Sequence, residues 1–265
     1  MIKRFTNSEI PKTLYKYRDW SNNYHQDLIR KREIFITNPS DFNDPFENIP
    51  IRWDLISEEE CDNQHYEIFK YIFKDKSEQE IRKIAKEITN SKILLHPSKL
   101  SIENPNQIED WNNKIGILSL SEECDNILMW SHYAKNHTGF VLGFDTNLFL
   151  NNSDFDYIEN VKYCTEYPII KSIGENDDFY KKFFHKSNDW QYEKEWRLSK
   201  NHIMDRLYVI PKEAITELII GCKMNNKTKS EIVDVAKNSL GSNLKIYQAT
   251  KDIENFKLNI NLIEN

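Results

Sequence analysis

The chain has 265 residues, of which 39% are hydrophobic and 12% aromatic, with only six glycines and eight prolines. This composition excludes a disordered or low-complexity chain and favours one compact α+β domain. The net charge of −6 is spread along the chain, which argues against a basic surface for duplex nucleic acid. No apolar run approaches the ~20 residues of a membrane span, and the four cysteines form no C-x-x-C pair. We therefore expect a cytoplasmic protein with reduced thiols and no membrane contact.

The first part of the chain predicts two short strands with a helix between them. The strands are expected at residues 14–18 and 34–37, where aromatic and β-branched residues gather. The helix carries Tyr24, Leu28 and Arg32 at i, i+4 spacing, which places them on one face.

A helical insert is predicted at about residues 57–113. Ser57 with Glu60, and Ser77 with Glu80, both match the S-x-x-E capping box, and an apolar stripe follows each box. Two amphipathic helices should therefore begin here, followed by a polar, proline-marked connector.

The remainder of the chain predicts most of the sheet. A helix at residues 127–135 is apolar on most faces, which predicts that it is buried, and Gly139 should end it. Lysine-rich helices are expected at residues 177–187 and 226–239. Strands are expected at residues 114–121, 140–145, 158–164, 195–198, 207–210, 218–222, 244–249 and 256–262.

The pair Glu193 and Glu195, with one residue between them, is the most informative motif. In an extended strand side chains alternate, so both carboxylates would point to one face and could reach one substrate. Trp196 would point the other way, into apolar packing. The alternative is an edge strand whose glutamates are solvated and whose Arg197 pairs with a neighbour.

Several other polar groups invite a chemical interpretation. Ser131 and His132 are neighbours on a helix and point to different sides, so they do not form a nucleophile with its base. A zinc site at Cys124, His132 and His137 would lack a fourth ligand.

The loop at residues 42–47 offers Asn43 and Asp44, either as site residues or as a self-capping turn. A nuclease with magnesium at Asp44, Glu193 and Glu195 is a further alternative. Against it, the residue two after Glu193 is a glutamate and not the usual lysine.

Across most of its length the chain resembles a bacterial family catalogued as a domain of unknown function, number 2971. The family name supplies no function. The resemblance rests on residues 14–18, Pro39 with residues 42–46, residues 118–121, residues 129–134 with His137 and Gly139, residues 143–145, and Trp190 with residues 192–197.

A remoter resemblance is to ADP-ribosyltransferases that place an arginine, a serine strand and a Glu-x-Glu around an NAD cleft. Here Arg18, then Ser119 and Ser121, then Glu193 and Glu195 follow in that order, although Leu120 replaces the threonine of the usual Ser-Thr-Ser strand.

The resemblance implies a role for each of these residues, with NAD as substrate. Glu195 would hold the nicotinamide ribose, Glu193 would activate a macromolecular acceptor, and Arg18 would bind a phosphate. A serine would support the pocket, and an aromatic residue would flank nicotinamide, with Tyr15, Tyr17 and Tyr133 as the candidates.

The resemblance also implies a single α+β domain over residues 1–265, with mixed or antiparallel split sheets around a central cleft. The strands at 14–18, 117–121 and 195–198 should converge on that cleft. A toxin or phage-defence role is common among such transferases. A non-enzymatic module that binds or senses a nucleotide or peptide, stacked on Tyr17, Trp130 or Tyr133, remains the main alternative.

Overall fold

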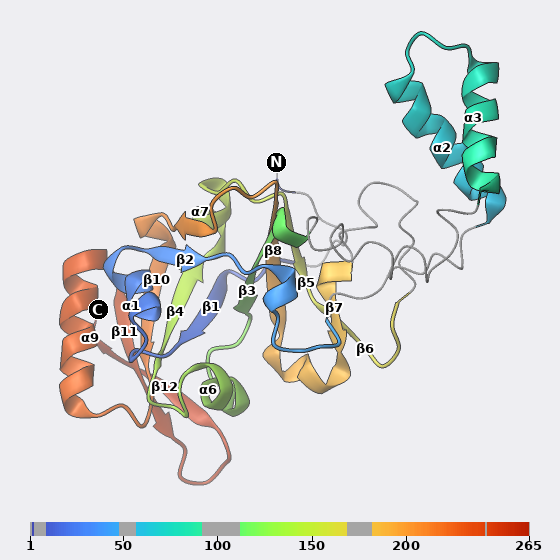
Figure 1. Ribbon diagram of the computed structural model, residues 1–265. Helices are drawn as coiled ribbons and strands as arrows, with labels where there is room; N and C mark the ends of the chain where they lie inside the picture. Colours follow the sequence, from blue (N-terminus) through green and yellow to red (C-terminus); the bar gives the residue numbers. More distant parts are fainter. Residues whose placement is uncertain are drawn as a thin grey trace.

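The computed structural model describes residues 2, 9–47, 57–91, 112–168, 182–241 and 243–264. At its centre is an eight-stranded mixed sheet in which only β10 and β11 run parallel (Figure 1). The fold is therefore of the mixed α+β class. In spatial order the strands are β12 (Leu258–Glu264), β11 (Lys245–Lys251), β10 (Ile215–Ile220), β4 (Phe140–Asp145), β1 (Thr13–Arg18), β3 (Ile115–Ser121), β8 (Glu195–Asn201) and β5 (Tyr157–Asn160).

The sheet is nearly divided between β1 and β3. Six residue pairs join β1 to β4, and seven join β3 to β8, but β1 and β3 share only the pair Tyr15 and Ser121. The expectation of separate split sheets was therefore wrong, because this one pair keeps all eight strands in a single order. Two further sheets have two strands each, β2 (Glu33–Phe35) with β9 (Leu207–Val209) and β6 (Lys162–Cys164) with β7 (His185–Ser187).

Helices cover both faces of the sheet. The larger core lies on the face covered by α1 (Asn23–Arg30) and α9 (Asn226–Leu240), where Leu28 and Ile232 are fully buried. On the other face, α6 (Ile127–Tyr133) packs Trp130 edge-to-face on Tyr17 at 5.5 Å. The short α7 (Thr146–Asn151) follows β4 directly, and the helix η5 (Lys212–Ala214) precedes β10.

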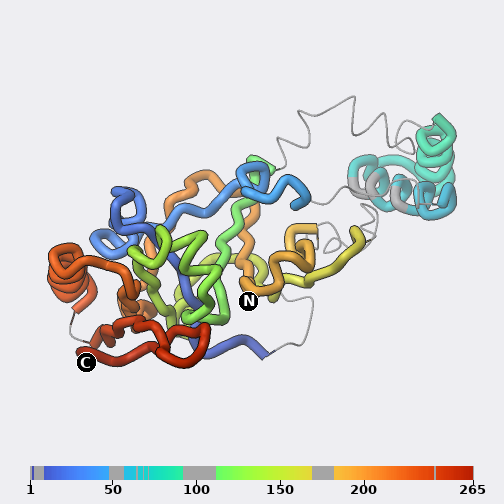
Figure 2. The backbone as a smooth tube through the Cα atoms, turned by 90° about the horizontal axis from the view of Figure 1, so that it is seen from below, coloured from blue at the N-terminus to red at the C-terminus, as the bar shows by residue number. Residues whose placement is uncertain are grey.

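The insert begins with the two predicted helices, α2 (Glu58–Ile72) and α3 (Glu78–Asn90), and both capping boxes are formed. The pair has a small core of its own, with Tyr66, Ile81 and Ala85 buried. In both views it stands apart from the sheet (Figures 1 and 2). The predicted connector at residues 92–111 lies outside the described residues.

Several sequence-based predictions need correction. Residues 182–187 are a 3-10 turn, η3 (Lys182–Phe184), followed by β7, because this segment pairs with β6; residues 177–181 lie outside the described part. Helix α6 is buried on one side only, since Ile127 and Leu128 are 40% and 44% exposed. The strand predicted at 158–164 is broken at Val161, whose N–H bonds to the Glu195 carbonyl.

Among the described residues, no helix combines the length and the apolar character that crossing a bilayer requires.

Candidate active site

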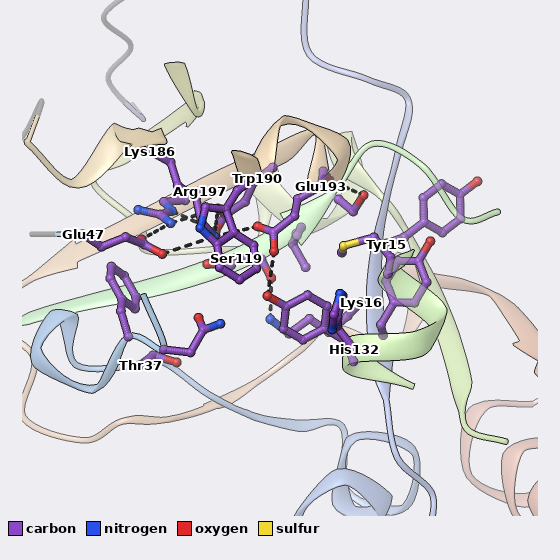
Figure 3. A pocket seen from close by; sticks show the side chains of 18 of the residues that line it. Tyr15, Lys16, Thr37, Glu47, Ser119, His132, Lys186, Trp190, Glu193 and Arg197 are labelled. Atoms are coloured by element: carbon purple, nitrogen blue, oxygen red, sulfur yellow. Dashed lines mark hydrogen bonds and ion pairs between the residues drawn. The ribbon is translucent and has the colours of Figure 1, made fainter. Parts of the chain in front are cut away.

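A cleft of about 530 Å³ opens where β1 and β3 separate (Figure 3). All seven residues predicted for the site line it, from both sides of the opening: Tyr17, Arg18, Ser119, Ser121, Tyr133, Glu193 and Glu195. Asn43, which the sequence offered as a site residue or as part of a self-capping turn, also lines the cleft. Further lining residues were not assigned to the site from the sequence, among them Lys16, Phe42, Glu47, Lys186, Trp190 and Arg197.

Two cations on β1 form one wall of the cleft. Within the described part of the chain, no carboxylate lies within ion-pair distance of Lys16 or Arg18. The Nζ of Lys16 donates instead to the Ser119 carbonyl, across the gap where the β1–β3 ladder has ended. Burial, followed by the repulsion of Arg18, lowers the pKa of Lys16 well below its ordinary value, and burial lowers that of Arg18 to about 10. Among the described residues, Arg18 is therefore a partly buried cation without a carboxylate partner, and Lys16 beside it is an amine that gives up its proton more readily than usual.

Glu193 and Glu195 form the opposite wall of the cleft. They do not face it as alternate residues of one strand, which is what the sequence had predicted. Glu193 ends a 3-10 helix, η4 (Asn188–Glu193), and Glu195 begins β8. Between them Lys194 has φ 41°, a left-handed conformation that turns the chain sharply. Both carboxylates are buried, at 3% and 6% exposure, and β8 lies between β3 and β5, so the alternative of solvated glutamates on an edge strand was wrong, although its pairing of Arg197 was right.

Lys186 and Arg197 hold three carboxylates together. The Nζ of Lys186 lies 2.7 Å from Glu193, 3.2 Å from Glu47 and 3.5 Å from Glu195 (Figure 3). Arg197 donates from Nε to Oε1 of Glu195 at 2.8 Å, from Nη2 to Oε2 at 2.9 Å, and also to Glu47. A carboxylate that is gripped at both oxygens by one guanidinium is rigidly oriented.

This network separates the protonation behaviour of the two glutamates. Burial opposes the charge of Glu195, but Arg197 and Lys186 outweigh it and lower its pKa to about 2. Burial and the nearby Glu195 raise the pKa of Glu193 above its ordinary value. The site thus pairs a firmly ionised carboxylate with one that binds a proton more readily, a pattern typical of acid and base roles.

Tyr133 connects this wall to helix α6. Its hydroxyl donates to Oε1 of Glu193 at 2.6 Å. Burial and the negative charge of Glu193 raise the pKa of Tyr133, so the phenol remains protonated and acts as a donor.

The remaining predicted residues mainly support the cleft. The Ser121 hydroxyl donates to the Glu193 carbonyl at 2.7 Å, and the Tyr17 hydroxyl donates to the Glu123 carbonyl at 2.8 Å. Both hydroxyls thus bond to the main chain, while Ser119, the third predicted hydroxyl residue, lines the cleft.

The residues that the sequence suggested as metal ligands do not form a metal site in the described part of the chain. Asp44 is absent from the cleft lining, and its Oδ1 accepts the Phe46 N–H in a local turn. Among the described residues, no group of three or more histidines, cysteines and acids has a metal-binding arrangement.

Arg197, Lys186, Glu47 and Lys16 are the important residues that sequence reasoning missed. Arg197 carried a usable signal, because it lies two residues after Glu195 in a strand and must share its face. Lys186 and Glu47 carried none, since only the tertiary fold brings them to the glutamates.

Residues 129–198 match the model of a family described as protein of unknown function (DUF2971). This supports the family resemblance inferred from the motifs over that part of the chain. The match begins within α6 and ends within β8, so it contains Tyr133, Lys186, Glu193, Glu195 and Arg197, while Lys16, Arg18 and Glu47 lie outside it. Comparison with curated proteins and with solved structures gave no match.

Proposed function

We propose that the cleft binds NAD and cleaves it, transferring ADP-ribose to a macromolecular acceptor in the manner of an ADP-ribosyltransferase. One observation carries the proposal: the basic residues Lys16 and Arg18, which have no carboxylate within ion-pair distance in the described part of the chain, share a cleft with Glu193 and Glu195, whose pKa values are shifted in opposite directions. The cations suit a pyrophosphate, and the carboxylates suit the charge that develops on a ribose.

The arrangement of charge in the cleft favours an anion beside β1. Four acidic residues, Asp41 at the exposed rim and Glu47, Glu193 and Glu195 further in, share the lining with four basic ones, Lys16, Arg18, Lys186 and Arg197. Lys186 and Arg197 already contact the three inner carboxylates, so the positive charge of β1 remains available. Arg18 is the better phosphate ligand because its guanidinium can donate two parallel hydrogen bonds.

In the proposed reaction, the bond between the nicotinamide nitrogen and the ribose carbon breaks, and its electron pair leaves with neutral nicotinamide. The ribose then carries positive charge, which ionised Glu195 stabilises electrostatically at short range. The acceptor nucleophile bonds to the same ribose carbon, and its proton passes to the Glu193 carboxylate, whose raised pKa suits a general base. Tyr133 and Lys186 orient Glu193 for that step.

A binding or sensing module is the second candidate, favoured by one observation. Both oxygens of Glu195 already accept hydrogen bonds from Arg197, as expected of a structural carboxylate. In that case a nucleotide would bind in the cleft and leave unchanged.

Incubation with labelled NAD and cell extract separates the two candidates. Nicotinamide release and labelled acceptor are expected from the wild type, with a loss of roughly hundredfold, about 3 kcal/mol, in Glu195→Gln. Glu193→Gln should suppress transfer to the acceptor and spare slow NAD hydrolysis. Since Glu195 neutralises buried cations, circular dichroism must first show that Glu195→Gln is folded.

Arg18→Gln should weaken NAD binding by roughly 10-fold to 100-fold, the loss expected for a charged hydrogen bond. Arg30→Gln on α1 is the matched control, because this arginine is 41% exposed and outside the cleft. NAD binding without nicotinamide release would favour the binding module. Equal labelling by the wild type and folded Glu195→Gln would exclude the mechanism.

A further inference from the structure

Strand β12 leaves one edge of the large sheet open. It is last in the strand order and pairs with β11 along one side. Among the described residues, no strand pairs with its other side (Figure 2). Such an edge presents free backbone donors and acceptors to any chain that can match its register.

The sequence of this edge is self-complementary. From Leu258 to Leu262 it reads Leu-Asn-Ile-Asn-Leu, which is the same in both directions. If two copies pair antiparallel with Ile260 at the twofold axis, Leu258 faces Leu262 of the second copy and Asn259 faces Asn261 of the second copy. Ile260 then faces its own equivalent. Apolar residues meet apolar residues on one face of the joined sheet, and amides meet amides on the other.

The exposure of the strand agrees with this pairing. Leu258 is buried in the core beneath α6 and Ile260 packs partly against it, while Leu262, on the same face, is 51% exposed and would be covered by the second copy. Residues 258–263 contain no charged side chain and no proline, the usual devices that prevent edge pairing.

The flanking residues favour antiparallel pairing over parallel pairing. Lys257 precedes the strand and Glu264 ends it, so antiparallel copies bring opposite charges close, while parallel copies would bring like charges together. At the hairpin tip, Ile253 and Phe256 are 97% and 101% exposed. Antiparallel pairing places this tip beside Ile263 of the second copy, which is itself 45% exposed in the free chain.

We propose that the partner of this edge is a second copy of the chain, and that the two β12 strands pair antiparallel about Ile260 to join two eight-stranded sheets. The proposal is independent of the chemistry in the cleft.

The first test is the mass in solution by light scattering after size exclusion, at chain concentrations from about 1 to about 100 µM. The wild type should reach twice the chain mass of 31.7 kDa. Asn261→Lys should shift the protein to monomer, because the two new charges lie on diagonal positions of the joined strands. Asn151→Lys on α7 is the matched control and should leave the dimer intact. A wild type that stays at the chain mass throughout would overturn the proposal.

A charge-swap experiment tests whether Asn261→Lys is monomeric because of the new charge and not because it is misfolded. Asn261→Asp alone should also be monomeric, but mixing it with Asn261→Lys should restore the dimer mass. Failure of a folded mixture to associate would contradict pairing at this strand.

Cysteine cross-linking tests the register. Ile260→Cys should form a covalent dimer on mild oxidation, because residue 260 directly faces itself, whereas Asn261→Cys should cross-link more slowly across the diagonal. The reverse order would overturn pairing about Ile260.

Discussion

Tyr133 on α6 and Glu193 at the end of η4 are joined by a hydrogen bond of 2.6 Å from the phenol to Oε1. With Lys186 at 2.7 Å from Oε2, each oxygen of Glu193 has one donor, and each retains a lone pair for a further donor. The carboxylate is thus fixed in position by one donor at each oxygen, whereas Oε2 of Glu195 accepts from both Arg197 and Lys186.

Removing the Tyr133 hydroxyl should change the pKa of Glu193 and slow its proposed reaction step without unfolding the protein. Tyr133→Phe deletes a hydrogen bond to a charged acceptor, so we expect the pKa of Glu193 to rise further and acceptor labelling to slow roughly tenfold. The pKa can be followed by NMR of the labelled carboxyl carbon. Tyr24→Phe, at a residue that is 85% exposed, is the control; an unchanged Glu193 titration in Tyr133→Phe would refute the role of the phenol.

The two glutamates should differ sharply in their effect on stability. Glu195→Gln leaves Arg197 and Lys186 short of a buried counter-charge, which should cost about 3–5 kcal/mol of unfolding free energy. Glu193→Gln removes a buried carboxylate that resists ionisation, so at neutral pH it should be neutral or stabilising. Urea unfolding measures the stability of each variant. The double variant Glu195→Gln, Arg197→Met should recover part of the stability that Glu195→Gln loses. Equal destabilisation by Glu195→Gln and Glu193→Gln would contradict the network.

Glu195 and Glu193 should make opposite contributions to the pH dependence of stability. Glu195 has a folded pKa of about 2, below its ordinary 4.5, so its contribution is present above 4.5 and is lost as the pH falls towards 2. Glu193 has a raised pKa, so it carries no penalty below 4.5 and penalises the fold as the pH rises through its folded value. The stability advantage of Glu193→Gln over wild type should therefore shrink on acidification to pH 4.5. An advantage that grows instead would exclude a raised pKa at Glu193.

Nucleotide binding should draw a proton onto Lys16. Its pKa is lowered by burial, and an incoming phosphate would supply the missing counter-charge and raise it again. Above neutral pH, calorimetric titrations with NAD in two buffers of different ionisation enthalpy should reveal proton uptake. Lys16→Met should bind with less uptake, and identical uptake in both proteins would assign the proton to another group.

Much of the fold could be predicted from local sequence patterns. Both capping boxes, the strand at β1 and the buried run of β3 were predictable, because each depends on residues close in sequence. The prediction of a helix at 177–187 failed over its described part, since pairing with β6 overrides local propensity.

The site was predictable only as a set of candidate residues. Their presence on one cleft follows from the order of β1, β3 and β8, but the charge network does not, because Glu47 and Arg197 are 150 positions apart. Nor did the pattern reveal that Lys194 adopts a left-handed conformation between the glutamates, since lysine rarely does so.

The long stretch of chain between β1 and β8 determines when the cleft can form during synthesis. The walls of the cleft come from β1 and from β8, which ends at Asn201, so most of the chain must be synthesised before they can meet. Contacts of such long range form late, after their loop-closure entropy has been overcome. A growing chain or an amino-terminal fragment that stops before β8 would thus carry the β1 wall of the cleft without Glu193, Glu195 and Arg197.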